Sequence, residues 1–143
     1  MSALAALIPH QADMCLLERV IEWNDESIHL ETTTHRSLQN PLRSGDELHA
    51  VHLCEYGAQA MAVHGALQAQ ARGSTAAPGM LVSLRAVEFH CDRIDDLPGP
   101  LHIQAQCLQA SAASQQYSFT VSHAGTLLAQ GRAAVVLGET PAA

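Results

Sequence analysis

The longest periodic run of apolar positions in the chain covers residues 46–72. Apolar or small side chains recur there at intervals of three and four, which is the spacing of one face of an α-helix. These positions are Val51, Cys54, Ala58, Met61 and Gly65 or Ala66. Ala, Leu, Met, Gln and Glu dominate the run, and all of them have high intrinsic helix propensity. The pattern therefore predicts one long helix over residues 46–72.

Both ends of the predicted helix carry residues that commonly begin and end helices. Ser44 and Glu47 have the spacing of a capping box, and Asp46 is a second candidate for the N-cap. Arg72 falls in the last turn and Gly73 follows it, as at many helix C-termini. We therefore expect the helix to begin near Asp46 and to end at Arg72.

The rest of the chain alternates between strand-like and turn-like segments. Segments rich in β-formers and bounded by turn residues cover 16–23, 27–34, 80–91, 101–110, 115–123 and 126–137. Short connections at 24–25, 111–114 and 124–125 predict antiparallel hairpins. A helix that is apolar around most of its girth needs a curved sheet to cover it. The pattern thus predicts a single α+β domain over residues 1–143.

Composition and charge narrow the possible functions. Fourteen acidic residues against seven arginines, with no lysine, give a formal net charge of -7, which is unfavourable for binding nucleic acid. The chain has no run of about 18 apolar residues that would cross a membrane. Its N-terminus lacks the basic segment of a signal peptide. The four cysteines lack C-x-x-C spacing, so we expect them to be reduced thiols. We also expect a cytoplasmic protein that needs no cofactor.

Glu55 is the unusual residue of the predicted helix, because apolar and small residues surround it. Burying a lone carboxylate costs several kcal/mol, so Glu55 must reach water, a partner or a substrate. Gln59 follows one turn later. Two interpretations remain open: Glu55 lies on a solvated edge of the helix, as most helical glutamates do, or it belongs to a functional site.

A metal site is a further interpretation of the same segment. His49 and His52 lie one turn apart, and Glu55 follows one turn later, which is a spacing found in metal sites. Helical histidines with this spacing are more often solvated or hydrogen-bonded, and the sequence supplies no outer ligands. We therefore predict no metal site.

Two motifs resemble those of a known family. Residues 7–10 (LIPH) and 14–20 (MCLLERV) resemble the LPH…LLVDRV opening of the hotdog-fold 3-hydroxyacyl-acyl carrier protein dehydratases. Residues 55–60 (EYGAQA) resemble the E-A-x-A-Q-A helix motif of that family. The predicted order of elements also fits the hotdog fold, in which a curved antiparallel sheet wraps one long central helix. Within the family, the chain is similar to a divergent group of predicted dehydratases, some of them associated with aryl polyene synthesis.

The chain departs from this family at one catalytic position. The dehydratases carry a histidine in a G-H-F-P loop before the helix, whereas Asn40 or Pro41 stands at that place here. Dehydration of a 3-hydroxyacyl thioester needs a base for the C2 proton, an acid for the departing hydroxyl and donors for the thioester carbonyl. The resemblance makes Glu55 the acid, and His10 becomes the expected base. The alternative for His10 is that it caps or orients its own loop.

The resemblance also implies residues that contact the substrate and its carrier. The backbone N–H groups of Ala50 and Val51, at the start of the helix, would bind the thioester carbonyl. Asn40 and Gln59 are further candidates for substrate binding. Arg43 is the candidate for docking an acidic carrier protein, because the chain has few cations and Arg43 stands close to the proposed site in sequence.

The implied function is reversible dehydration of a 3-hydroxyacyl thioester to the trans-2-enoyl thioester, in fatty acid or polyene-like synthesis. The thioester would be carried by acyl carrier protein or coenzyme A. One alternative is a hotdog acyl thioesterase, in which Glu55 would activate water. Another is a non-catalytic subunit of a heteromeric hotdog dehydratase, which the missing loop histidine would fit. We expect a homodimer or a hetero-oligomer with another hotdog chain, because a lone sheet leaves its strand edges open.

Overall fold

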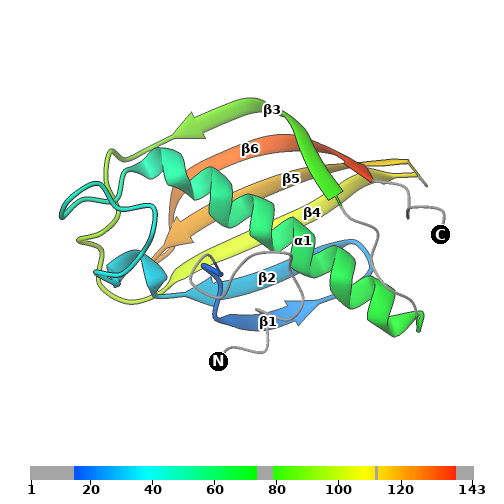
Figure 1. Ribbon diagram of the computed structural model, residues 1–143, viewed down its shortest axis with the longest axis horizontal. Coiled ribbons are helices and arrows are strands. Elements are labelled where there is room, and N and C mark those ends of the chain that lie inside the picture. Colours follow the sequence, from blue (N-terminus) through cyan, green and yellow to red (C-terminus); the bar gives the residue numbers. More distant parts are fainter. Residues whose placement is uncertain (1–14, 74–78, 112, 138–143) are drawn as a thin grey trace.

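The computed structural model describes residues 15–73, 79–111 and 113–137, which form one long helix and six strands (Figure 1). The strands are β1 (Arg19–Trp23), β2 (Ser27–Thr32), β3 (Gly79–Phe89), β4 (Leu101–Ala110), β5 (Ser114–His123) and β6 (Thr126–Leu137). The helix α1 spans Leu53–Ala71, and two short 3-10 turns, η3 (Thr34–Arg36) and η4 (Ala50–His52), lie between β2 and α1. The predicted order of two strands, a helix and four strands is confirmed.

The strands form one antiparallel sheet in the order β1-β2-β4-β5-β6-β3. The sheet curves around α1, which lies across its inner face (Figure 1). The predicted hairpins between β1 and β2, β4 and β5, and β5 and β6 are confirmed. In the described part of the chain, no helix is long and apolar enough to cross a membrane.

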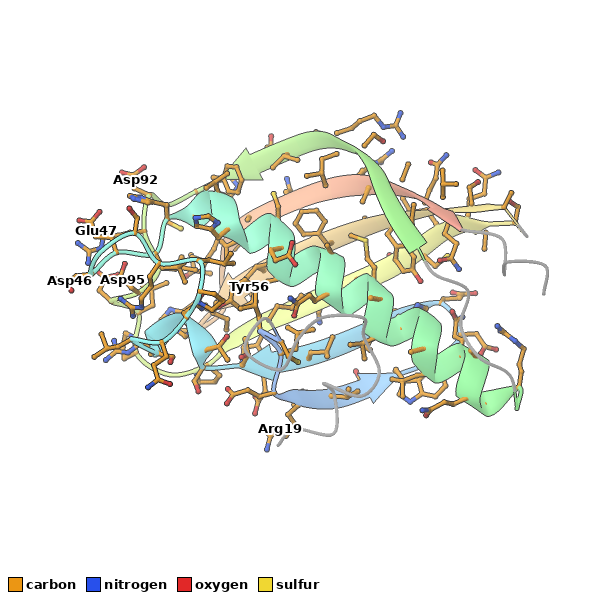
Figure 2. All side chains as sticks on the ribbon, in the orientation of Figure 1. Arg19, Asp46, Glu47, Tyr56, Asp92 and Asp95 are labelled. Atoms are coloured by element: carbon orange, nitrogen blue, oxygen red, sulfur yellow. The ribbon has the colours of Figure 1, made fainter. Side chains whose placement is uncertain are left out.

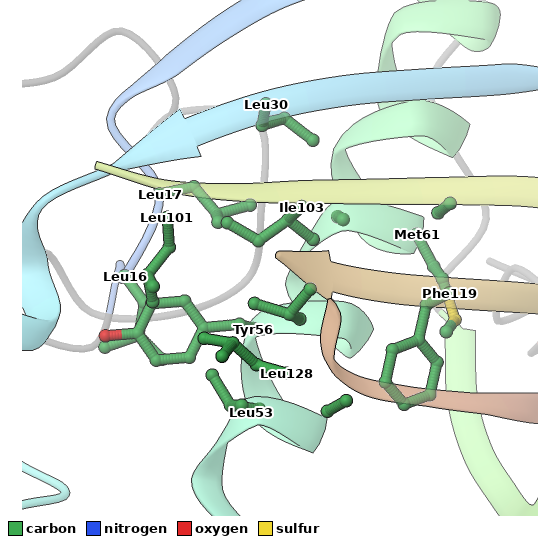
Figure 3. Packing of buried hydrophobic residues seen from close by; sticks show 14 of the residues in the cluster. Leu16, Leu17, Leu30, Leu53, Tyr56, Met61, Leu101, Ile103, Phe119 and Leu128 are labelled. Atoms are coloured by element: carbon green, nitrogen blue, oxygen red, sulfur yellow. The ribbon is translucent and has the colours of Figure 1, made fainter. Parts of the chain in front are cut away.

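The hydrophobic core lies between α1 and the inner face of the sheet. Inward-pointing residues of the central strands, among them Leu30, Ile103 and Phe119, are almost fully buried (Figure 3). Tyr56 of α1 is fully buried against them. Along β2, the buried positions alternate with half-exposed ones, as expected when one face of a sheet is covered. The helix therefore has its first turns held firmly against the sheet.

The backbone of α1 approaches the ring of Phe119 closely at Gly57. A Cβ atom at position 57 would lie only 2.6 Å from this ring. Gly131 of β6 borders the same ring, and a Cβ atom there would lie 3.0 Å from it. The absence of a side chain at these two positions makes room for Phe119 between the helix and the sheet.

The helix begins later than predicted, because the expected capping box forms a turn instead. The N–H of Ser44 donates to the carbonyl of Glu47 at 2.8 Å, and the N–H of Glu47 donates back at 3.2 Å. Gly45 takes a φ of 62° in this turn, a conformation that favours glycine. No side chain of either N-cap residue caps η4 or α1. The sequence prediction of Asp46 as the helix start is therefore wrong by seven residues.

The buried side of the helix agrees with the predicted one only in part. Val51 lies ahead of α1 with 57% of its surface exposed, while Cys54 and Ala58 are only half-buried. Two other predicted positions, Met61 and Ala66, are buried as expected. The largest fully buried side chains of the first helical turns are the neighbouring Leu53 and Tyr56. These larger side chains gain more free energy from burial than Cys or Ala does.

The remaining boundaries differ little from the prediction. Strand β1 begins at Arg19, so residues 16–18 precede it, and β2 ends at Thr32. Arg72 is the C-cap of α1 and Gly73 follows it, as predicted.

Candidate active site at the start of the long helix

Glu55 lies in the first turn of α1, half-buried, and contacts Gln59 one turn later. Nε2 of Gln59 donates to Oε1 of Glu55 at 3.3 Å. The Gln59 side chain is fully buried, and its Oε1 accepts a hydrogen bond from the N–H of Leu16 at 2.8 Å. Because the backbone N–H can only donate, it fixes which end of the amide turns toward Glu55. The two motif residues are therefore in contact, and Leu16 orients the second of them.

The backbone of Leu16 is held on both sides. Its N–H donates to Gln59, and its carbonyl accepts hydrogen bonds from the hydroxyls of Thr32 and Thr34, each at 2.6 Å. These bonds fix the backbone of Leu16 beside Gln59 of α1. His10 lies outside the described residues, so its predicted role as the base stays a prediction.

Asn40 belongs to a buried hydrogen-bond network around Tyr56. Its Nδ2 donates to the carbonyl of Thr34 at 3.0 Å and to the Tyr56 hydroxyl at 3.1 Å, and its Oδ1 accepts from the N–H of Leu42 at 2.9 Å. The Thr34 hydroxyl lies 3.0 Å from the same tyrosine oxygen. Burial raises the pKa of Tyr56 above its usual value, so the hydroxyl stays protonated. These contacts give Asn40 a structural role in the loop before α1, while substrate binding by Asn40 stays a prediction.

The two backbone groups expected to bind a thioester carbonyl differ in their surroundings. The N–H of Ala50 donates to the carbonyl of Asp92 at 2.9 Å. This bond joins the helix start to the β3–β4 connection, and binding of a thioester carbonyl by the Ala50 N–H stays a prediction. The role of the Val51 N–H stays a prediction.

Acidic residues gather at the N-terminal end of α1, as Figure 2 shows for Asp46, Glu47, Asp92 and Asp95. Arg93, in the connection between β3 and β4, forms ion pairs with two of these residues. Its guanidinium lies 2.5 Å from Oδ2 of Asp95 and 3.3 Å from Oε1 of Glu47. The hydrogen bonds from Arg93 hold the pKa of Asp95 well below its usual range. The pairing leaves this end of the helix predominantly acidic.

Arg43 ties the loop before α1 together. Its guanidinium donates to three backbone carbonyls, those of Ser37 at 2.6 Å, Asp46 at 2.7 Å and His35 at 3.2 Å. The sequence predicted a docking role for Arg43 and did not reveal this structural one. The difference arises because carbonyl partners become visible only once the path of the loop is known.

Arg43→Glu is expected to lower the free energy of unfolding by about 2–3 kcal/mol, because hydrogen bonds from a charged donor are lost. Arg36→Glu, at an exposed arginine of the same segment, is the matched control and should change stability by less than about 0.5 kcal/mol. Chemical denaturation measures both variants. A normally stable Arg43→Glu protein that has a raised KM for carrier-bound substrate alone would instead support the docking role.

Two other kinds of site, a metal site and a surface hollow, bear on where the active site lies. Among residues 15–73, 79–111 and 113–137, no three His, Cys, Asp or Glu side chains are placed to hold a metal ion. A hollow of about 420 Å³ is lined by residues of β1, β2, β4 and β5, including Glu22, His29, Gln104 and Thr120. Neither Glu55 nor Gln59 lines it, so the hollow is separate from the candidate active site.

Comparison with known proteins identifies the family. The sequence model of the ApeP-like family, described as ApeP dehydratase, matches residues 2–142. No curated protein matches the chain. Among solved structures, the dehydratase heterocomplex ApeI:P from Xenorhabdus doucetiae matches with a TM-score of 0.86 and 27% sequence identity, covering 96% of this chain and 91% of that chain.

Two thioesterases have a similar structure at lower identity. Zebra fish thioesterase superfamily member 2 matches with a TM-score of 0.65 and 20% identity, covering 94% of this chain and 93% of that chain. A hypothetical thioesterase with coenzyme A from Streptococcus pneumoniae matches with a TM-score of 0.62 and 10% identity, covering 87% and 88%. At these identities the likeness shows the hotdog fold alone. Because the family match extends over nearly the whole chain, the chain belongs to the ApeP-like dehydratases.

Proposed function

We propose that this chain dehydrates a 3-hydroxyacyl thioester, borne by an acyl carrier protein, to the trans-2-enoyl thioester in the cytoplasm. The observation that carries the proposal is the contact between Glu55 and Gln59 at the start of α1, in a chain of the ApeP-like dehydratase family. The match to the ApeI:P dehydratase heterocomplex supports the same class of reaction.

In the proposed reaction, Glu55 gives its proton to the hydroxyl on C3 of the substrate. A base removes the C2 proton, the electrons of that C–H bond form the C2–C3 double bond, and the C3–O bond breaks to release water. Gln59 is a positioning residue in this scheme, because its N–H holds one oxygen of the Glu55 carboxyl group. The N–H of Val51, near the helix start, is the proposed donor to the thioester carbonyl.

His10 is the proposed base. Leu16 is bonded to Gln59, and the six residues from Leu16 back to His10 span at most about 20 Å of chain. A chain of this length is long enough for His10 to reach the first turns of α1. A histidine from a second hotdog chain is the alternative source of the base.

A heteromeric complex with another hotdog chain is the assembly we propose. The relative with 27% identity is described as a heterocomplex, and the usual loop histidine is replaced here by Asn40 or Pro41. The same two observations favour a second candidate function, in which this chain is a non-catalytic subunit that supports an active partner.

The test is incubation with a 3-hydroxyacyl carrier protein, with and without a second hotdog dehydratase, followed by intact-mass analysis. Loss of one water with this chain alone supports the proposal. Loss of water only when the partner is present, and unchanged by substitution of Glu55, supports the non-catalytic subunit. Release of the free acid indicates a thioesterase, and an unchanged substrate in both reactions contradicts the proposal.

Gln59→Leu is expected to lower kcat about tenfold or more, because Glu55 loses the donor that orients it. It should also lower the free energy of unfolding by about 1–3 kcal/mol, since the buried N–H of Leu16 loses its acceptor. Gln70→Leu, at an exposed position of the same helix, is the control and should change neither quantity. Enoyl thioester absorbance and chemical denaturation report the two effects. A folded Gln59→Leu enzyme with normal kcat would remove Gln59 from the mechanism.

A further inference from the structure

His35 is fully buried, and among the described residues only one of its ring nitrogens has a hydrogen-bond partner. Nε2 lies 2.9 Å from the carbonyl oxygen of Leu97 and therefore carries the proton, because a carbonyl can only accept. Nδ1 is also buried, and no described residue hydrogen-bonds to it. A second proton, on Nδ1, would be a buried donor without an acceptor, which costs free energy. The site is therefore built for a neutral ring.

The bond from His35 to Leu97 joins two loops at the N-terminal end of α1. His35 belongs to the connection between β2 and α1, and Leu97 belongs to the connection between β3 and β4. The same two loops also meet at Leu48, whose N–H donates to Oδ1 of Asp95 at 2.9 Å and whose carbonyl accepts from the N–H of Ile94 at 2.9 Å. His35 is thus one of several links, and the only one of these three that involves an imidazole.

The charged groups around His35 mostly oppose its protonation. Arg36 is its neighbour in η3, and Arg43 donates to its carbonyl at 3.2 Å. His123, at the end of β5, donates to the carbonyl of Pro98, which follows Leu97, at 2.5 Å. Glu18 is the carboxylate that acts in the opposite sense. Burial has the largest effect on the pKa of His35, and the hydrogen bond to Leu97 acts against it. Together with Arg36, His123 and Arg43, burial lowers this pKa below the ordinary value of 6.5.

We propose that His35 is a pH-sensitive latch between the β2–α1 and β3–β4 loops, closed while its ring is neutral and opened when the ring takes up a second proton. Opening brings the charged ring into water, where both ring N–H groups find acceptors. It also removes a brace beside η4 and the first turn of α1. The latch is a property of the fold and does not depend on the proposed reaction.

The direction of the effect follows from where the proton binds. In the open state the ring titrates near 6.5, whereas in the closed state it stays neutral at lower pH. Opening is therefore unaffected by pH well above 6.5 and becomes more favourable as the pH falls through this value. If the closed state binds no proton, the open population is about twofold larger at pH 6.5, and about elevenfold larger at pH 5.5, than it is at pH well above 6.5.

Hydrogen exchange followed by mass spectrometry on the intact protein tests the proposal. After correction for intrinsic exchange rates, protection in residues 34–43 and 93–101 should fall about tenfold between pH 7.5 and pH 5.5. His35→Gln keeps a donor for Leu97 but cannot titrate, so it should abolish this dependence. His90→Gln, the same change at an exposed histidine, should leave the dependence as in the wild type. Unchanged protection in the wild type between these pH values would overturn the latch.

A second measurement needs no variant at His35. Nitrogen-15 NMR of the histidine rings distinguishes a neutral ring with its proton on Nε2 from a doubly protonated one. The His35 signals should report a neutral ring at pH 6.5, and protonation at lower pH should accompany the loss of protection in the two loops. A doubly protonated ring at pH 6.5, with both loops still protected, would contradict the proposal.

Discussion

Replacing Glu55 with glutamine is expected to lower kcat at least about 100-fold and to leave the fold unchanged. The amide has the shape of the carboxyl group and keeps an oxygen that accepts from Nε2 of Gln59, but it cannot give up a proton as a carboxylic acid does. Enoyl thioester absorbance measures the rate, and thermal unfolding checks that the variant is folded.

Glu47→Gln is the matched control, because Glu47 is a carboxylate at the same end of α1 that pairs with Arg93. It should keep nearly normal kcat. Normal kcat in Glu55→Gln would exclude Glu55 as the general acid. An equal loss in both variants would mean that the negative charge at this end of the helix matters, and not the proton of Glu55.

Gly57→Ala is expected to lower the free energy of unfolding by about 2 kcal/mol. The new methyl group would lie 2.6 Å from the ring of Phe119, so we take the upper end of the usual cost of overpacking, about 3 kcal/mol. The higher helix propensity of alanine offsets about 1 kcal/mol of this loss in the free energy of unfolding. Chemical denaturation measures the difference.

Gly65→Ala separates packing from propensity in the same helix. A Cβ atom at position 65 would have no atom within 4 Å beyond the nearby backbone of its own helix, so this variant should be more stable by about 0.5–1 kcal/mol. Phe119→Leu should lower the free energy of unfolding by less in the Gly57→Ala variant than in the wild type, because the smaller side chain relieves the overlap. Equal stabilisation by both glycine substitutions would show that the ring of Phe119 does not lie against Gly57.

Periodicity was sufficient to predict the order of the elements and the hairpins. The intervals of three and four in residues 53–71, and the short turns after residues 23, 110 and 123, depend on local chemistry that is visible in the sequence. The start of the helix was not visible, because Ser44 and Glu47 suit a tight turn around Gly45 as well as a capping box. Local signals alone could not decide between these two structures.

The candidate site was predicted only in part, for a related reason. Glu55 and Gln59 are four residues apart on a helix, so their contact follows from the sequence. The bond from the N–H of Leu16 to Gln59 involves a backbone group, and a backbone group is present whatever the residue type, so the sequence could not indicate it. The carbonyl partners of Arg43 likewise depend on the path of its loop. The bond from Asn40 to Tyr56 depends on the path of the same loop.

The pairing of β2 with β4 has a consequence for the growing chain on the ribosome. Ser27 lies opposite Gln106 in this pair, and α1 is made between them. The apolar side of α1 therefore has only the β1–β2 hairpin beside it until β4, β5 and β6 have been translated. At about 5–20 residues per second, that interval lasts several seconds. A chaperone that binds exposed apolar helices would find its target on nascent chains from which α1 has emerged and β6 has not.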